Sequence, residues 1–122
     1  MKKINRYENY HKHDHESNVM TLDCVVKNTD YIERSLELGC KNYFTTQHGW
    51  AGKFLEAYDL CKKNNLKMIY GAELYMVKDR KEKDNSNYHI VIIAKNQDGF
   101  YELNEIMSES SKLDSTIKQG LI

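Results

Sequence analysis

The chain has 122 residues, of which 18 are basic and 18 acidic, so its formal net charge is zero. This length fits one domain or part of one. The balanced charge argues against a strongly basic nucleic-acid-binding surface, although a local basic patch remains compatible with it.

The sequence also bears on the compartment and on membrane attachment. It shows no signal-peptide pattern, and its longest apolar run, Ile90 to Ala94, is far shorter than a membrane-spanning helix. The three cysteines, Cys24, Cys40 and Cys61, are odd in number and lack a Cys-x-x-Cys spacing. Free thiols in a reducing compartment are therefore expected, and we predict a cytoplasmic protein without a membrane partner.

The first predicted element carries a tract of histidines. Tyr7 to His13 is predicted as a strand, and His11, His13 and His15 follow one another at a spacing of two. Side chains alternate across a strand, so a strand would point these imidazoles to one side. Asp23 lies in the loop predicted after this tract. Three imidazoles with a carboxylate favour a zinc or manganese site, and a polar strand at a solvated sheet edge is the alternative.

Two helices with a strand between them are predicted next. The first helix would begin at one of the candidate N-caps in 28–30 and stop at Gly39. A strand covers Lys41 to Thr46, and His48 comes shortly after it. The second helix is predicted from an apolar stripe at helical spacing between Phe54 and Cys61.

The next segments are predicted as two further strands. The first covers Lys67 to Gly71, with Glu73 just past it, and Leu74 to Val77 either extends or reverses this strand. A polar loop follows at Lys78 to Asn87. The continuous apolar run from His89 to Ala94 predicts a strand buried on both faces.

A third helix and a tail complete the chain. The helix is predicted to start near Asn96 or Gln97, and its pattern fades from Ser108 onward. We expect residues 1–111 to form the N-terminal part of a domain. Lys112 to Ile122 lack periodicity and are predicted as a disordered tail or a truncated continuation.

This alternation of strands and helices predicts an α/β architecture with right-handed crossovers. In such folds, functional residues gather beyond the carboxyl ends of parallel strands. His13, His48 and Glu73 all fall at or near predicted strand ends. The sequence therefore predicts that they meet in one metal site.

In this order, these motifs resemble the PHP (polymerase and histidinol phosphatase) domain. The pattern is His-x-His, an Asp, a strand followed by His-Gly, then Gly-x-Glu, and finally Tyr-His before an apolar strand. It is most similar to the N-terminal PHP domain of the alpha subunit of bacterial and phage DNA polymerase III. The shared segments are Leu38 to Gly49, Gly71 to Tyr75 and Tyr88 to Asn96, and the resemblance covers Tyr10 to Ser111.

The resemblance implies a fold, a set of metal ligands and a cofactor. The fold would be a distorted seven-stranded β/α barrel, of which this chain supplies about the first half. Intact members hold up to three divalent ions, for which zinc and manganese are the main candidates and magnesium a further one. Glu73 would bridge the ions and, with His48, would lie closest to the chemistry. His13 with His15 is an alternative first pair. The implied metal ligands are His11, His13, Asp23, His48, Glu73 and His89.

The chain departs from the family pattern at several positions. Gln47 stands where the family has a carboxylate, whereas Ser17 matches a serine of the family. Asp14 replaces a small hydroxyl residue and would either support the metal site or serve as a loop acid. His89 begins its strand instead of ending it, so either that strand runs the other way or the following loop brings the imidazole round. The family's later Cys and Asp-x-His ligands have no counterpart in this sequence.

The function implied by the resemblance is metal-dependent phosphoester hydrolysis of the 3′–5′ exonuclease type. The chain would be the N-terminal PHP portion of a DNA-directed DNA polymerase in DNA replication. It would meet DNA through the parent polymerase and the remaining domains of that subunit. We expect the chain alone to bind metal without activity, because its ligand set is incomplete. An open sheet edge would also favour self-association.

Two alternatives remain at this point. One is a stand-alone PHP phosphatase that acts on small phosphomonoesters. The other is a catalytically silent truncated fragment, such as a decayed prophage gene or a shortened chain.

Overall fold

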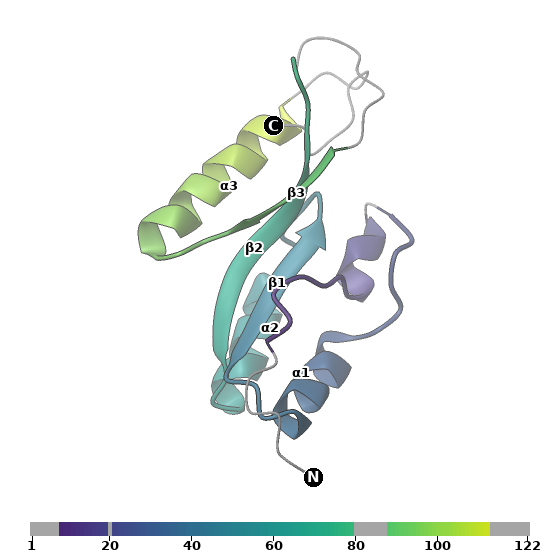
Figure 1. The fold of residues 1–122 in the computed structure, drawn as a ribbon, viewed down its shortest axis with the longest axis vertical. Coiled ribbons are helices and arrows are strands. Elements are labelled where there is room, and N and C mark those ends of the chain that lie inside the picture. Colours follow the sequence, from purple (N-terminus) through teal and green to yellow (C-terminus); the bar gives the residue numbers. More distant parts are fainter. Residues whose placement is uncertain (1–7, 20, 80–87, 113–122) are drawn as a thin grey trace.

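The computed structural model describes residues 8–19, 21–79 and 88–112. They form a short 3-10 helix, three α-helices and a three-stranded sheet (Figure 1). The predicted α/β class is confirmed, and the architecture is consistent with part of a PHP-type barrel. In chain order the elements are η1 (His15–Val19), α1 (Asn28–Glu37), β1 (Asn42–His48), α2 (Phe54–Lys63), β2 (Lys67–Met76), β3 (Tyr88–Ile93) and α3 (Gln97–Ser111).

The strand order in the sheet is β1-β2-β3. β1 and β2 are parallel and are joined through α2, whereas β3 is antiparallel to β2. The strand that begins with the Tyr88-His89 pair therefore runs the other way, and its start lies beside the end of β2, where Tyr75 pairs with His89. β2 continues to Met76, so Leu74 to Val77 extends this strand and does not reverse it.

The predicted first strand is wrong over its described part, because residues 8–13 form no strand. This segment attaches to β1 through side chains instead of a ladder of backbone hydrogen bonds. The Lys12 N–H donates to the Thr46 hydroxyl, and that hydroxyl donates to the Lys12 carbonyl, each at 3.0 Å. The Glu8 carboxylate accepts bonds from the N–H groups of Lys41 and Asn42. In Figure 1 the purple N-terminal segment passes in front of β1 and leads to η1.

Helix boundaries largely follow the sequence prediction. The N-cap of α1 is Lys27, so the prediction of an N-cap within 28–30 is wrong by one residue. The Lys27 N–H donates to the Asp30 carboxylate at 3.3 Å, and the helix stops before Gly39, which has φ of 73°. The Asn96 side chain caps α3 by accepting a bond from the Gly99 N–H at 2.9 Å. α3 continues past Ser108 to Ser111. Residues 80–87 of the predicted loop and 113–122 of the predicted tail lie outside the described residues.

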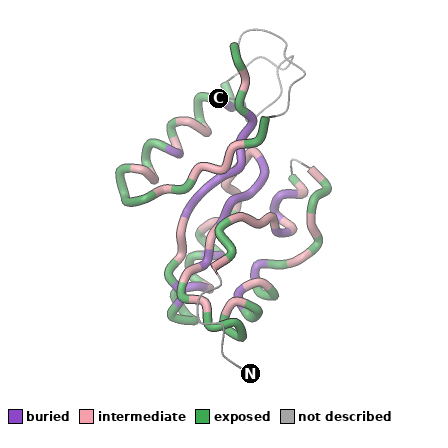
Figure 2. Tube along the Cα trace, in the orientation of Figure 1, coloured by how far each residue is buried: buried purple, intermediate pink, exposed green. Residues whose placement is uncertain are grey.

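The apolar core lies between the sheet and the helices. One cluster joins Ile32 of α1, Tyr43 of β1 and Cys61 of α2, and a second joins the face of β2 that carries Leu74 to Leu103 of α3. Figure 2 shows buried residues concentrated along β1 and β2. The sequence predicted that the strand from His89 to Ala94 is buried on both faces, and this prediction is wrong. In the described part of the chain β3 lies at the edge of the sheet, and α3 covers only its Ile90 and Ile92 face, which leaves Ile93 36% exposed.

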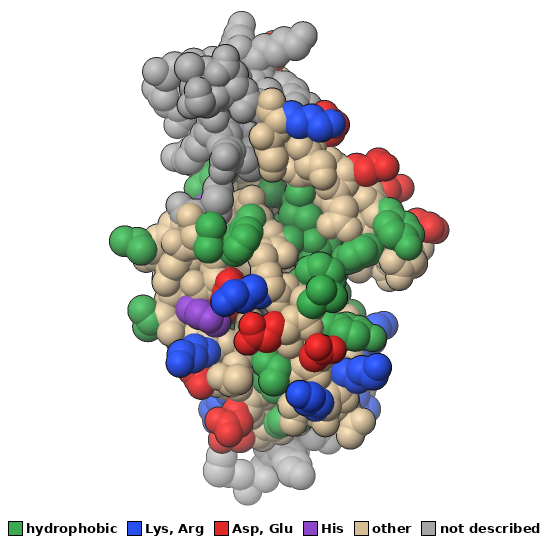
Figure 3. Space-filling view, turned by 180° about the vertical axis from the view of Figure 1, so that it is seen from behind, with side chains coloured by type: hydrophobic (Ala, Val, Ile, Leu, Met, Phe, Trp, Pro, Cys, Tyr) green, Lys and Arg blue, Asp and Glu red, His purple; other side chains and the backbone are tan. Residues whose placement is uncertain are grey.

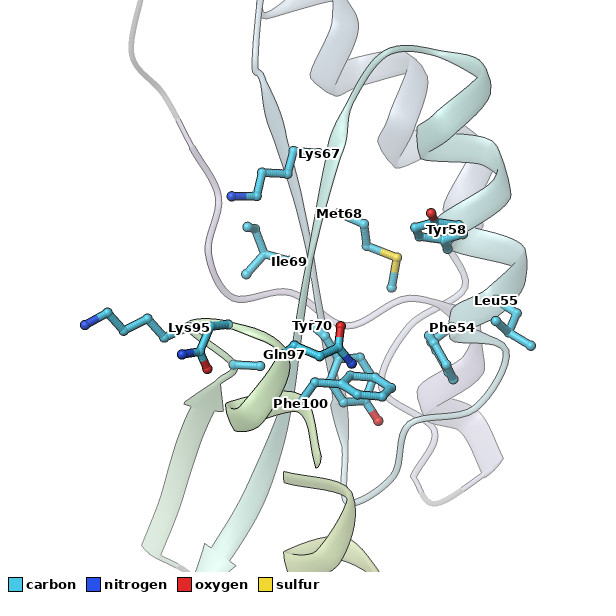
Figure 4. Close-up of a pocket in the computed structure, with 12 residues that line it drawn as sticks. Phe54, Leu55, Tyr58, Lys67, Met68, Ile69, Tyr70, Lys95, Gln97 and Phe100 are labelled. Carbon is cyan, nitrogen blue, oxygen red and sulfur yellow. The ribbon is translucent and has the colours of Figure 1, made fainter. Parts of the chain in front are cut away.

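A cavity of about 520 Å³ opens between α2, β2 and the start of α3 (Figure 4). The rings of Phe54, Tyr70 and Phe100 line it, with centroids 4.8–5.8 Å apart. Figure 3 shows the molecule from behind, with hydrophobic side chains gathered near the middle of this rear face and charged side chains around them. Among the described residues, no helix is long and apolar enough to cross a membrane.

Candidate metal centre

The ends of β1 and β2 and the start of β3 bring polar side chains to one face of the sheet. His48 ends β1 and pairs in register with Glu73 of β2. Gly49 follows with φ of 71°, a conformation that favours glycine, and its N–H donates to the Glu73 carbonyl at 2.7 Å. Because side chains alternate along a strand, Glu73 and Tyr75 project from the face opposite Ala72 and Leu74.

The buried Glu73 carboxylate lies at the centre of four imidazoles. Its Oε1 atom is 2.9 Å from His89 Nδ1 and 3.5 Å from His11 Nε2. Its Oε2 atom is 2.8 Å from His13 Nε2 and 3.3 Å from His48 Nδ1. Glu73 is only 6% exposed, and no lysine or arginine in the described part of the chain forms an ion pair with it. The two oxygens therefore face two different pairs of histidines.

Asp23 joins the same site from the loop after η1. Its Oδ2 atom is 3.0 Å from His13 Nδ1 and 3.1 Å from His48 Nδ1. Burial acts to raise the pKa of Asp23, but a hydrogen bond and the nearby His48 and His13 outweigh it and lower that pKa. Two groups of potential ligand atoms, each within 4.8 Å of one another, result: His11, His13 and Glu73, and His13, Asp23 and His48.

Two buried polar atoms of this cluster lack hydrogen-bond partners among the described residues, as expected for atoms that bind a metal ion. His13 Nε2 and Glu73 Oε2 are buried and 2.8 Å apart, yet within the described residues neither has a hydrogen-bond partner. Buried polar atoms are nearly always hydrogen-bonded, so this pair is an exception that a shared cation would explain. Imidazole nitrogens with carboxylate oxygens suit zinc or manganese. The donor set therefore fits the divalent ions that the sequence implied.

The charge state of His11 also suits a ligand. Burial is the largest effect on its pKa and lowers it, Glu73 acts to raise it, and the neighbouring His13, His48 and His89 lower it again. The net effect lowers the pKa of His11 below its ordinary value. A neutral imidazole is the form that binds a metal.

Tyr75 belongs to the site but was missed by sequence reasoning. Its hydroxyl is hydrogen-bonded to His48 Nε2, and its ring packs against His48 and His89, with centroids 5.1 and 4.7 Å away. Burial raises the pKa of Tyr75, and the carboxylates of Glu73 and Asp23 raise it further, so the phenol stays neutral. The available signal was its position two residues after Glu73, which puts both on one face of β2.

A second layer of polar side chains holds η1 against β1. The Ser17 hydroxyl and the Asp14 N–H both donate to Gln47 Oε1, at 2.7 and 3.2 Å. The His48 N–H in turn donates to the Ser17 hydroxyl at 3.2 Å. The buried Asp14 carboxylate accepts a bond from the Glu16 N–H at 2.8 Å, which makes it a cap of η1. The Gln47 amide thus takes a supporting position behind His48.

His15 lies apart from the candidate metal centre. His15 begins η1, and residues 8–13 before it form no strand, so the strand alternation that was predicted to align His15 with His13 does not occur. His15 Nε2 lies 3.0 Å from Glu16 Oε1, which is also 2.9 Å from Lys53 Nζ. The hydrogen bond and the charge of Glu16 raise the pKa of Lys53. Within the described residues, neither group of potential metal ligands includes His15.

The chain is similar to known proteins over most of its length. The PHP domain family matches residues 10–119. The alpha subunit of DNA polymerase III from Borreliella burgdorferi is 31% identical over 106 residues, which cover 82% of this chain. The same subunit from Helicobacter pylori is 30% identical over 84% of the chain. A PolC-type DNA polymerase III from Caldanaerobacter subterraneus is 41% identical over 48% of it.

These relatives are much longer than the matched region. The match covers 9% of the Borreliella subunit, 8% of the Helicobacter subunit and 4% of the PolC-type enzyme. This chain therefore matches only a small part of each relative. The chain belongs to the PHP domain family.

Proposed function

We propose that this chain is the N-terminal PHP portion of a DNA polymerase III alpha subunit and acts in DNA replication. Its site would be a metal-dependent phosphoesterase site of the 3′–5′ exonuclease type. The observation that carries this proposal is the Glu73 carboxylate, whose two oxygens face two pairs of imidazoles with no lysine or arginine paired to it in the described chain. The similarity to polymerase subunits favours this branch over a phosphatase of small phosphomonoesters.

The residues divide into two sets around Glu73. His11 and His89 face Oε1, and His13 and His48 face Oε2, with Asp23 next to the second pair. Zinc or manganese ions, with magnesium as a further candidate, would activate water and neutralise charge on a phosphate. Glu73 would hold the two sets at a fixed separation, which is the role expected of a bridging carboxylate. Imidazoles bind a metal in their neutral form, so they would orient the ions without adding charge.

This chain should bind metal ions without hydrolysing DNA efficiently. Six candidate ligands suffice for at least one ion with an open position. The resemblance implies further Cys and Asp-x-His ligands that this sequence does not contain. We therefore propose that the chain alone binds metal and hydrolyses DNA only near background. In the cell it would work in the cytoplasm, where DNA and the other domains of the subunit are its partners.

The test compares metal binding with nuclease activity. Calorimetric titration of the chain with zinc and with manganese should give at least one site, and Glu73→Gln should abolish or strongly weaken it. Glu16→Gln is the matched control, because Glu16 is equally buried but is paired with Lys53 and His15. A chain without metal affinity would contradict the proposed site. Robust manganese-dependent release of nucleotides from a DNA 3′ end, lost in Glu73→Gln, would contradict the proposed inactivity.

A further inference from the structure

We propose that Thr46 is a positioning residue that keeps the His11 proton on Nδ1 and thereby leaves Nε2 as the metal-ligand atom. The proposal rests on the proposed metal-dependent function and adds to it how one histidine is oriented. Thr46 lies on β1, two residues before His48, and is 0% exposed. Its hydroxyl contacts three groups of the segment that carries His11.

The tautomer follows from counting the hydrogen bonds of this hydroxyl. A hydroxyl can donate one bond and accept two. The contact of Thr46 with the Lys12 carbonyl, at 3.0 Å, uses its single proton, because a carbonyl oxygen can only accept. The Lys12 N–H donates to the same oxygen at 3.0 Å. The third contact, with His11 Nδ1 at 3.0 Å, is then a hydrogen bond only if Nδ1 carries a proton.

A neutral imidazole has one N–H group, so a proton on Nδ1 leaves Nε2 with a free lone pair. His11 Nε2 lies 3.5 Å from Glu73 Oε1, which is longer than a good hydrogen bond and leaves both atoms able to share an ion. Partners that orient metal-binding histidines typically act through the other ring nitrogen in this way. Thr46 also ties the Lys12 backbone to β1, so it fixes the position of the segment together with the tautomer of the ring.

The test begins with metal-free protein, so that it does not depend on activity. Nitrogen-15 NMR of labelled histidines at pH 8, where an imidazole with an ordinary pKa of about 6.5 is neutral, reports which nitrogen is protonated. We expect Nδ1–H for His11 in the wild-type chain and in Thr46→Ser, which keeps the hydroxyl. Thr46→Val should lose this preference. Thr45→Val is the matched control, because the buried Thr45 hydroxyl has no hydrogen-bond partner in the described chain.

Zinc titration of the same four proteins gives the second measurement. Thr46→Val should bind zinc about 10- to 100-fold more weakly, as is typical when a partner of a ligating histidine is removed. Thr46→Ser and Thr45→Val should bind like the wild type. If Thr46→Val also shifts the His13 signals, residues 8–13 have detached from β1, and this variant no longer tests the tautomer alone. Thr46→Ser then decides: if His11 keeps its proton on Nδ1 in this variant, the proposal is supported, and if it does not, the proposal is overturned.

Other results overturn the proposal directly. These are a wild-type His11 with its proton on Nε2, or a Thr46→Val variant with unchanged tautomer or unchanged zinc affinity. A wild-type chain with the expected tautomer but no affinity for zinc or manganese would instead overturn the proposed function.

Discussion

Both faces of β2 are buried near the end of the strand, but they differ in chemistry. Ala72 and Leu74 point to the helix-covered face and pack in the cluster that contains Leu103 of α3. Glu73 and Tyr75 alternate with them and point to the face that carries the histidines. The first face removes apolar surface from water and so stabilises the fold. The second gathers polar groups whose burial costs free energy unless each is paired. Stability and function should therefore respond to different substitutions in one strand.

A second carboxylate shows what a fully paired group looks like in the same chain. Glu16 is as buried as Glu73, but it lies within 3.0 Å of both Lys53 Nζ and His15 Nε2, and its carbonyl accepts a bond from the Trp50 ring N–H. Its charge is balanced by a lysine. Among the described residues, the Glu73 carboxylate lies next to imidazoles and next to no lysine or arginine. Burial alone therefore does not mark a ligand, whereas the identity of its neighbours does.

The largest effect on stability is expected from the helix-covered face. Leu103→Ala removes a side chain that is 1% exposed, which should lower the free energy of unfolding by about 2–5 kcal/mol. Urea denaturation of the metal-free chain measures this loss. Zinc affinity of the protein that remains folded should match the wild type. A parallel loss of zinc affinity in the folded fraction would show that the two faces are coupled.

The next largest effect is expected from the opposite face and should appear only with metal. His11→Ala combined with His13→Ala should lower both the metal stoichiometry and the metal-dependent rise in melting temperature. A ligand at 100 times its dissociation constant stabilises a fold by about 2.7 kcal/mol, and this contribution should disappear. Nuclease activity should stay near background with or without the change.

His15→Ala is the control for this double substitution, since His15 belongs to the same tract but contacts Glu16. It should leave the metal-dependent rise in melting temperature intact. An equal loss in His15→Ala would mean that the histidine tract acts as a whole and that the separation of His15 from the site is wrong.

A smaller effect is expected at Tyr75. Tyr75→Phe keeps the ring between His48 and His89 but removes the hydroxyl that bonds His48 Nε2. Metal affinity should fall by about tenfold, the lower end of the range for partners of ligating histidines. The melting temperature of the metal-free chain should change little. Titration with zinc and with manganese measures the first, and thermal denaturation in a chelator measures the second.

Local patterns predicted the helices and the strands at β1, β2 and β3, because apolar periodicity and caps are encoded within each segment. The positions of the candidate ligands followed from motif order. Other features depended on contacts distant in the chain. His11 and His13 share a side because Thr46 and Glu8 hold residues 8–13 beside β1, not because a strand forms there. The direction of β3 depends on its pairing with β2.

The smallest effect concerns alkaline pH and the helix-covered face. Burial raises the pKa of the Cys61 thiol to about 11, with the charge of Lys12 opposing it more weakly. An unfolded thiol ionises near pH 9, so between about pH 9 and 11 the folded chain holds a proton that the unfolded chain has lost. Raising the pH through this window therefore favours unfolding, by at most about 1.4 kcal/mol per pH unit for one group. Cys61→Ala should reduce the decline of the urea unfolding midpoint between pH 8.5 and 10, measured with a reductant present. A smaller decline should remain, because burial also raises the pKa values of the buried tyrosines Tyr43 and Tyr70. An unchanged decline in Cys61→Ala would show that the thiol is not shielded from water by its neighbours in α1 and β1.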